Sequence, residues 1–127
     1  MYHIVFVEDD PELGQLIAEF LSRHDMSVHI EPRGDRALAC IAAQQPDLVL
    51  LDIQLPDMTG LDISRELTRK YHADDLPPLV ALTANVLKDK KEYLDAGMDD
   101  VLSKPLSVPA LTAMIKKYWD TRNEEES

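Results

Sequence analysis

Six polar side chains stand where four apolar runs of this sequence end, and their types could bind a metal and react with phosphorus. They are, in chain order, Glu8, Asp9, Asp10, Asp52, Thr83 and Lys104. The three adjacent carboxylates repel one another, and they would also repel an anionic ligand unless a cation lay between them. Mg²⁺ suits such a place, because it takes oxygen ligands and usually keeps several waters that a phosphate can displace. We therefore expect two or three of these acids to hold a divalent metal.

The other three side chains fit phosphoryl transfer. Asp52 could attack phosphorus and form an aspartyl phosphate, because a bound metal would neutralise the charge that gathers on the transferring oxygens. Lys104 could offer a positive charge to one phosphoryl oxygen, and Thr83 could donate its hydroxyl to another. Neither G-x-G-x-x-G nor G-x-x-x-x-G-K-[ST] follows the first apolar run, so dinucleotide-binding and P-loop readings are excluded.

Alternating short and long elements must bring these side chains together. The sequence predicts strands at residues 3–7, 27–31 and 47–53 and within PPLVALTA and DDVLSKP. It predicts helices after the Asp10–Pro11 cap, at 34–45, at 61–71, at 86–97 with Gly97 as the C-terminal cap, and after Ser107. Five alternations predict an α/β fold with a doubly wound, five-stranded parallel sheet flanked by five helices. Ligands bind such a sheet beyond the carboxyl ends of its strands, where all six side chains would lie.

Composition sets the outer limits of the interpretation. The 127 residues, 45% of them hydrophobic, suffice for one domain, and the formal charge of −11 argues against direct binding to nucleic acid. No apolar run approaches the roughly 20 residues of a membrane span, and no leader opens the chain, so we expect a cytoplasmic domain without membrane contact. The lone Cys40 is expected to be a small buried helix residue. We expect a domain over residues 1–119 and an acidic, solvated tail or linker over 120–127.

The motifs around the six side chains resemble those of the receiver domain of bacterial two-component response regulators. The matching features are the acid pair at residues 8–9, DLVLLD, LPDMTG, LTA and SKP, and the resemblance runs from about residue 1 to 119. It implies a flavodoxin-like fold of the receiver type. It also implies a phosphorelay partner, either a histidine kinase or a histidine phosphotransfer domain.

The resemblance assigns roles to individual residues. It implies that Asp52 accepts a phosphoryl group from a phosphohistidine and that Asp9 ligates Mg²⁺ directly. Glu8 would act largely through water, and the backbone carbonyl of Gln54 would complete the protein's share of the metal ligands. The peptide bond between Lys104 and Pro105 is expected to be cis. Self-phosphorylation and slow autodephosphorylation are implied, without conventional turnover of an independent substrate, in a monomer or weak dimer.

Two parts of the chain resemble different branches of that family. Residues from about 47 onward resemble the receivers of hybrid sensor kinases, whereas residues 1 to about 46 resemble the receivers of DNA-binding response regulators. An engineered chimera and a divergent natural homologue both fit this pattern. Val101 stands where receivers that switch an output partner usually carry an aromatic residue, which favours a phosphotransfer role.

Simpler interpretations apply to several of these residues. Asp10 is expected to cap a helix rather than bind metal, and the acids Asp57, Asp62, Asp99 and Asp100 are expected to be solvated loop or cap residues. The histidines His3, His24, His29 and His72 are scattered, and none is expected to bind metal.

A phosphatase of the haloacid dehalogenase type would need an acid where Gln54 stands. A receiver-like module that is not phosphorylated would be expected to have lost Asp52, Lys104 or the acid pair.

Overall fold

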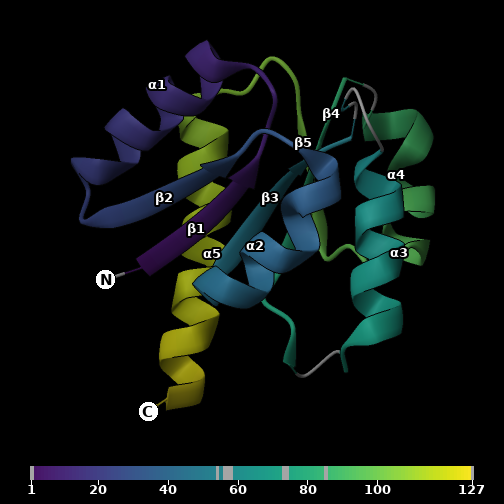
Figure 1. Cartoon of the computed structure of the whole chain (residues 1–127). Coiled ribbons are helices and arrows are strands. Elements are labelled where there is room, and N and C mark those ends of the chain that lie inside the picture. Colours follow the sequence, from purple (N-terminus) through teal and green to yellow (C-terminus); the bar gives the residue numbers. More distant parts are fainter. Residues whose placement is uncertain (1, 54, 56–58, 73–74, 85, 127) are drawn as a thin grey trace.

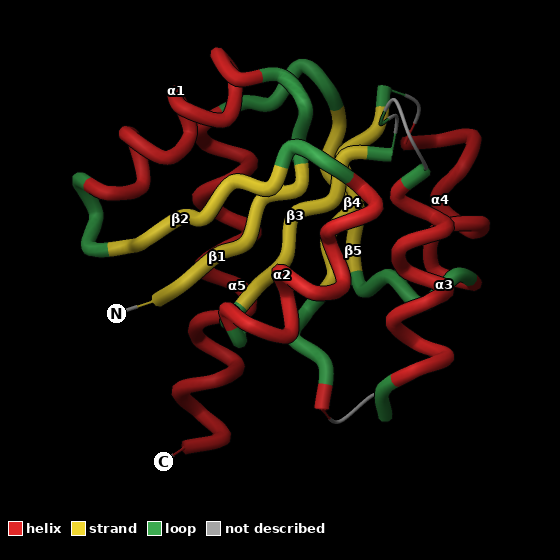
Figure 2. Tube along the Cα trace, in the orientation of Figure 1, coloured by secondary structure: helices red, strands yellow, loops and turns green. Residues whose placement is uncertain are grey.

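Five parallel strands form one sheet at the centre of the molecule (Figures 1 and 2). The computed structural model describes residues 2–53, 55, 59–72, 75–84 and 86–126. The strands are β1 (Tyr2–Val7), β2 (Met26–Glu31), β3 (Leu48–Asp52), β4 (Leu79–Thr83) and β5 (Asp100–Ser103). Their spatial order is β2-β1-β3-β4-β5, so the strand order reverses beside β1. The prediction of a doubly wound parallel sheet is confirmed.

Helices cover both faces of the sheet (Figure 1). They are α1 (Pro11–Ser22), α2 (Ala37–Gln44), α3 (Gly60–Lys70), α4 (Val86–Asp95) and α5 (Val108–Glu126). Ile4 and Phe6 of β1 pack in a core with α1 and α5, whereas Val5 and Val7 pack in a second core with α2, α3 and α4. Successive strand residues point to opposite faces, so β1 contributes to both cores, and all its residues from Ile4 to Val7 are apolar and buried.

Local signals in the sequence fix where the helices begin and end. The Asp10 side chain accepts hydrogen bonds from the backbone N–H groups of Glu12 and Leu13, so the predicted cap of α1 is confirmed. Thr59 and Asp62 form a capping box at the start of α3. After α4, Gly97 has φ +100°, and a Cβ there would lie 2.2 Å from Cγ2 of Thr68. Any other residue at this turn would be strained and would also clash.

Two helical segments differ from the sequence prediction. Residues 34–45 begin as a short 3₁₀ turn, η1 (Gly34–Arg36), before α2 starts at Ala37, and Gly34 and Asp35 are weak helix formers. At the other end of the chain, α5 continues to Glu126, past the expected boundary at residue 119. Glutamate favours helices, and residues 120–126 contain no glycine or proline that would stop one. No helix in the described ranges is long and apolar enough to span a bilayer.

Asp100 joins β5 to α5 and is not the solvated loop residue that we expected. Its Oδ2 accepts hydrogen bonds from Nζ of Lys117 (2.7 Å) and from the hydroxyl of Tyr118 (3.3 Å). Burial alone would raise the pKa of Asp100, but hydrogen bonds from Lys117 and the Val101 N–H outweigh it and lower that pKa. The Asp100 carboxylate therefore stays ionised and ties the last strand to the last helix.

Candidate functional site

Three carboxylates meet where β1 and β3 end. Glu8 and Asp9 follow β1, Asp52 is the last residue of β3, and these two strands are neighbours in the sheet. One carboxylate oxygen from each lies within 4.8 Å of the others. Glu8 and Asp52 are each only 2% exposed, whereas Asp9 is exposed to solvent. The structure thus places the predicted acids together, with one open side.

Lys104 approaches the same carboxylates from the end of β5. Its Nζ lies 3.0 Å from Oδ1 of Asp52 and 3.7 Å from Oε2 of Glu8. Its backbone N–H donates a hydrogen bond to the carbonyl of Thr83 (2.8 Å), which holds the β5 end against β4. The peptide bond to Pro105 is cis, as expected. The ammonium is partly exposed, so it can reach both the carboxylates and a ligand from solvent.

The electrostatics of this group are unbalanced in the protein alone. Glu8 Oε2 is buried and has no hydrogen-bond partner among the described residues. Burial, the hydrogen bond with Asp52 and the charge of Asp52 raise the pKa of Glu8 to about 7, although Lys104 and the Asp10 N–H act in the opposite direction. Oxygen ligands, a buried oxygen without a hydrogen-bond partner and excess negative charge are the surroundings that a hard divalent cation would satisfy.

Asp10 takes no part in this cluster. Its carboxylate caps α1, and only its backbone N–H turns back, donating to Oε1 of Glu8 (3.3 Å). Gln54 and Asp57 lie outside the described residues, so the structure does not place the expected carbonyl ligand.

The Thr83 hydroxyl at the end of β4 has a partner that the sequence analysis missed. Its Oγ1 lies 2.9 Å from the phenol oxygen of Tyr93 in α4, and both residues are buried. Tyr93 in the last turn of α4 and Ala96 directly after the helix are buried at i, i+3 spacing, and that spacing was the only available signal. Position 101 carries a buried valine of β5, not an aromatic residue. The aromatic group that contacts Thr83 is instead Tyr93 of α4.

The doubly wound fold thus brings acids, a hydroxyl and an ammonium to one edge of the sheet, in the α/β arrangement expected of a receiver domain. The model of the response regulator receiver domain family matches residues 4–116. The chain belongs to this family.

Its relatives include proteins of both expected branches. The aerobic respiration control sensor protein ArcB of Escherichia coli K12 is 65% identical over 124 residues, 97% of this chain and 16% of ArcB. The transcriptional regulatory protein RstA of the same organism is 47% identical over 103 residues, 81% of this chain and 38% of RstA. The chain thus spans about a sixth and about two-fifths of these two relatives. The two identities are consistent with the chimera interpretation.

A solved structure agrees with these sequence matches. The BeF3-activated N-terminal receiver domain of Klebsiella pneumoniae RstA has a TM-score of 0.81 and 43% identity. The match covers 91% of this chain and 97% of that one. The arrangement of strands and helices is therefore that of a receiver domain.

Proposed function

We propose that Asp52 accepts a phosphoryl group from a phosphohistidine in a Mg²⁺-dependent reaction and then passes it on or loses it slowly to water. The observation that carries this proposal is the placement of Asp52. Its carboxylate is buried, 3.0 Å from an ammonium, and within 4.8 Å of two further carboxylates. A merely structural ion pair would not need the two additional acids, which destabilise one another in the absence of a cation.

Each residue of the acid cluster, together with Lys104 and Thr83, has a part in the proposed reaction. An Asp52 oxygen attacks phosphorus, the O–P bond forms, and the P–N bond to the donor histidine breaks with its electron pair left on the imidazole. Glu8, Asp9 and Asp52 would hold Mg²⁺, which supplies charge neutralisation to the phosphoryl oxygens when bound. Lys104 already contacts Asp52 and would move to a phosphoryl oxygen. Thr83 would donate its hydroxyl to another phosphoryl oxygen.

The direct test is phosphorylation with a small acyl phosphate and Mg²⁺. The wild-type chain is expected to incorporate phosphate that is stable in acid but labile to base and to hydroxylamine. Asp52→Asn should reduce this incorporation to background, because an amide oxygen is a poor nucleophile toward phosphorus. The matched control is Asp75→Asn, since Asp75 is exposed and precedes β4 at the opposite end of the sheet. Undiminished labelling of Asp52→Asn would remove Asp52 from the central role.

The donor is a protein that carries phosphohistidine, either a histidine kinase or a histidine phosphotransfer domain. Similarity to ArcB and RstA supports an ArcB-type or an RstB-type donor, and the family supports a cytoplasmic location, where the ATP that charges such donors is made. The exposed side of α1 offers Glu12, Gln15 and Glu19 to a partner, with Leu16 63% exposed among them. We propose that this surface selects the donor, and that the domain is a monomer or a weak dimer.

A further inference from the structure

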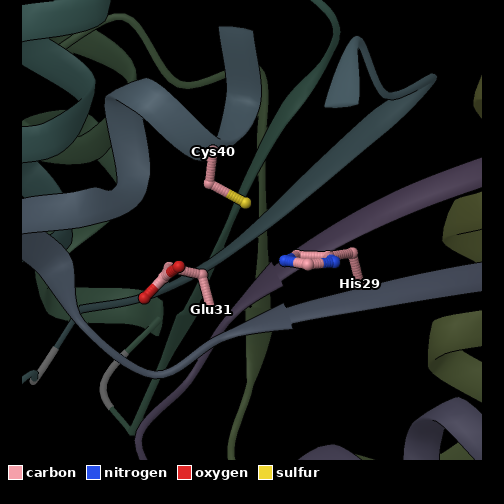
Figure 3. A group of neighbouring side chains, drawn as sticks. All are labelled: His29, Glu31 and Cys40. Atoms are coloured by element: carbon pink, nitrogen blue, oxygen red, sulfur yellow. The ribbon is translucent and has the colours of Figure 1, made fainter. Parts of the chain in front are cut away.

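A second group of metal-ligating side chains lies between β2 and α2, outside the acid cluster. Figure 3 shows His29 and Glu31 on β2 and Cys40 on α2, with the His29 ring and the Cys40 sulfur directed toward a common space and the Glu31 carboxylate beside it. Residues two apart in a strand point to the same side, so His29 and Glu31 both face the helix. A ring nitrogen, a carboxylate oxygen and the sulfur all lie within 4.8 Å of one another. This group combines nitrogen, oxygen and sulfur donors.

These three side chains make no hydrogen bond or salt bridge to another side chain in the described part of the chain. Within the described residues, His29 makes no side-chain hydrogen bond, whereas both ring nitrogens of His3 are engaged, with Ser27 (2.6 Å) and Gln44 (2.9 Å). Oε1 of Glu31 accepts the backbone N–H of Arg33 at 3.1 Å. The guanidinium of Arg33 pairs with Asp35 and leaves the Glu31 carboxylate without a salt bridge in the described part of the chain. Cys40 is a free, half-buried thiol.

We propose that His29, Glu31 and Cys40 form a binding site for Zn²⁺ or a chemically similar divalent cation. Nitrogen, thiolate and carboxylate at about 2.0–2.3 Å are the ligands that Zn²⁺ prefers, and a water would complete the tetrahedron. The thiol proton leaves to solvent, so the thiolate and the carboxylate balance the charge of the ion. Ligands of a tetrahedral site lie roughly 3.3–3.8 Å apart, so the side chains need to close by at most about 1.5 Å. Solvent exposure of His29 gives its ring room for this movement.

Ligand type separates this site from the acid cluster. Glu8, Asp9 and Asp52 offer only oxygen, which suits Mg²⁺, whereas a site with sulfur and imidazole selects a softer ion. The two sites are close in space, because the backbone carbonyl of Glu31 accepts a hydrogen bond from the backbone N–H of Glu8 (3.1 Å). Ions of different softness can therefore be used to occupy one site and not the other.

The test is a titration of the untagged, reduced chain with Co²⁺ in a large excess of Mg²⁺. Tetrahedral Co²⁺ bound to thiolate gives a charge-transfer band in the near ultraviolet and strong d–d bands in the visible. We expect saturation at one equivalent and bleaching of the bands by Zn²⁺. Cys40→Ser should remove the charge-transfer band. His29→Gln should weaken Co²⁺ binding by at least about ten-fold, because one of three protein ligands is lost.

Two variants serve as controls. His24→Gln removes another exposed histidine, and Asp9→Asn alters the acid cluster; both should leave the Co²⁺ spectrum and affinity unchanged. Far-ultraviolet circular dichroism establishes that each variant is folded. The exposed His29 keeps the test decisive even if Cys40→Ser does not fold. The proposal is overturned if the wild type gives no charge-transfer band, if His29→Gln binds as tightly as His24→Gln, or if only Asp9→Asn abolishes the signal.

Discussion

At the scale of single residues, the main feature is a carboxylate buried with too little positive charge around it. Glu8 is 2% exposed and its pKa is raised from 4.5 to about 7, first by burial and then by Asp52. The unfolded chain releases the Glu8 proton near pH 4.5, whereas the folded chain keeps it to about pH 7. The folded state therefore binds more protons in this interval, and stability falls as the pH rises through it.

The first prediction follows from this fall in stability as the pH rises. In chelator at pH 8, Glu8→Gln should be more stable than the wild type by on the order of 3 kcal/mol, the energy equivalent of the pKa shift. Its advantage should shrink as the pH is lowered and vanish near pH 4.5. Asp9→Asn should act in the same direction but less, because Asp9 is exposed. Urea unfolding across this pH range measures the effect, and a destabilised Glu8→Gln at pH 8 would contradict it.

At the scale of elements, a hydroxyl pair connects the end of β4 to α4. Thr83 and Tyr93 are hydrogen-bonded at 2.9 Å in the buried space between these elements. If Thr83 is the donor in this pair, its proton must leave the phenol oxygen before it can be donated to a phosphoryl oxygen on Asp52. In that arrangement, phosphorylation and the contact between β4 and α4 compete for one hydroxyl proton.

Tyr93→Phe tests this competition. Without ligand, the variant should lose about 1 kcal/mol of stability, the usual net value of one hydrogen bond. Beryllofluoride with Mg²⁺ mimics a phosphoryl group, and it should raise the melting temperature of Tyr93→Phe more than that of the wild type. Tyr71→Phe is the matched control, since Tyr71 is half-buried and follows α3. Equal thermal shifts for Tyr93→Phe and the wild type would mean that Thr83 does not exchange partners.

At the scale of the whole molecule, the sequence predicted the order of the elements and most of the acid cluster. Strand ends in a parallel sheet lie at one edge, so Asp52, Thr83 and Lys104 could be placed there from the alternation of elements alone. The contact of Thr83 with Tyr93 could not, because it depends on how α4 is rotated against the sheet. His29 and Cys40 lie eleven positions apart on different elements, and only the packing of α2 on β2 brings them together.

The proposed selection of the donor depends on surfaces from both ends of the chain. α1 precedes residue 46, in the part whose sequence resembles DNA-binding response regulators, whereas Leu106, Ser107 and the 42% exposed Val108 lie in the part that resembles hybrid sensor kinases. A donor that docks beside Asp52 would contact both. Phosphoryl transfer from ArcB-type and RstB-type donors should each be slower than transfer to that donor's own receiver, while acyl phosphates react normally. Quench-flow measurements of the phosphoryl-transfer rates test this prediction. If the ArcB-type donor phosphorylates this chain as fast as it phosphorylates the ArcB receiver, α1 does not determine donor specificity.

The strand order has a consequence for cutting the chain in two. β1 and β2 both precede residue 46, and β3, β4 and β5 all follow it, so a break in this loop leaves two contiguous half-sheets. One fragment would carry Glu8 and Asp9, and the other Asp52, Thr83 and Lys104. Their reassociation would depend on the ladder between β1 and β3 and on the two cores that both fragments share. Such a pair would make a split reporter, in which phosphorylation of Asp52 reads out whether two fused proteins have met.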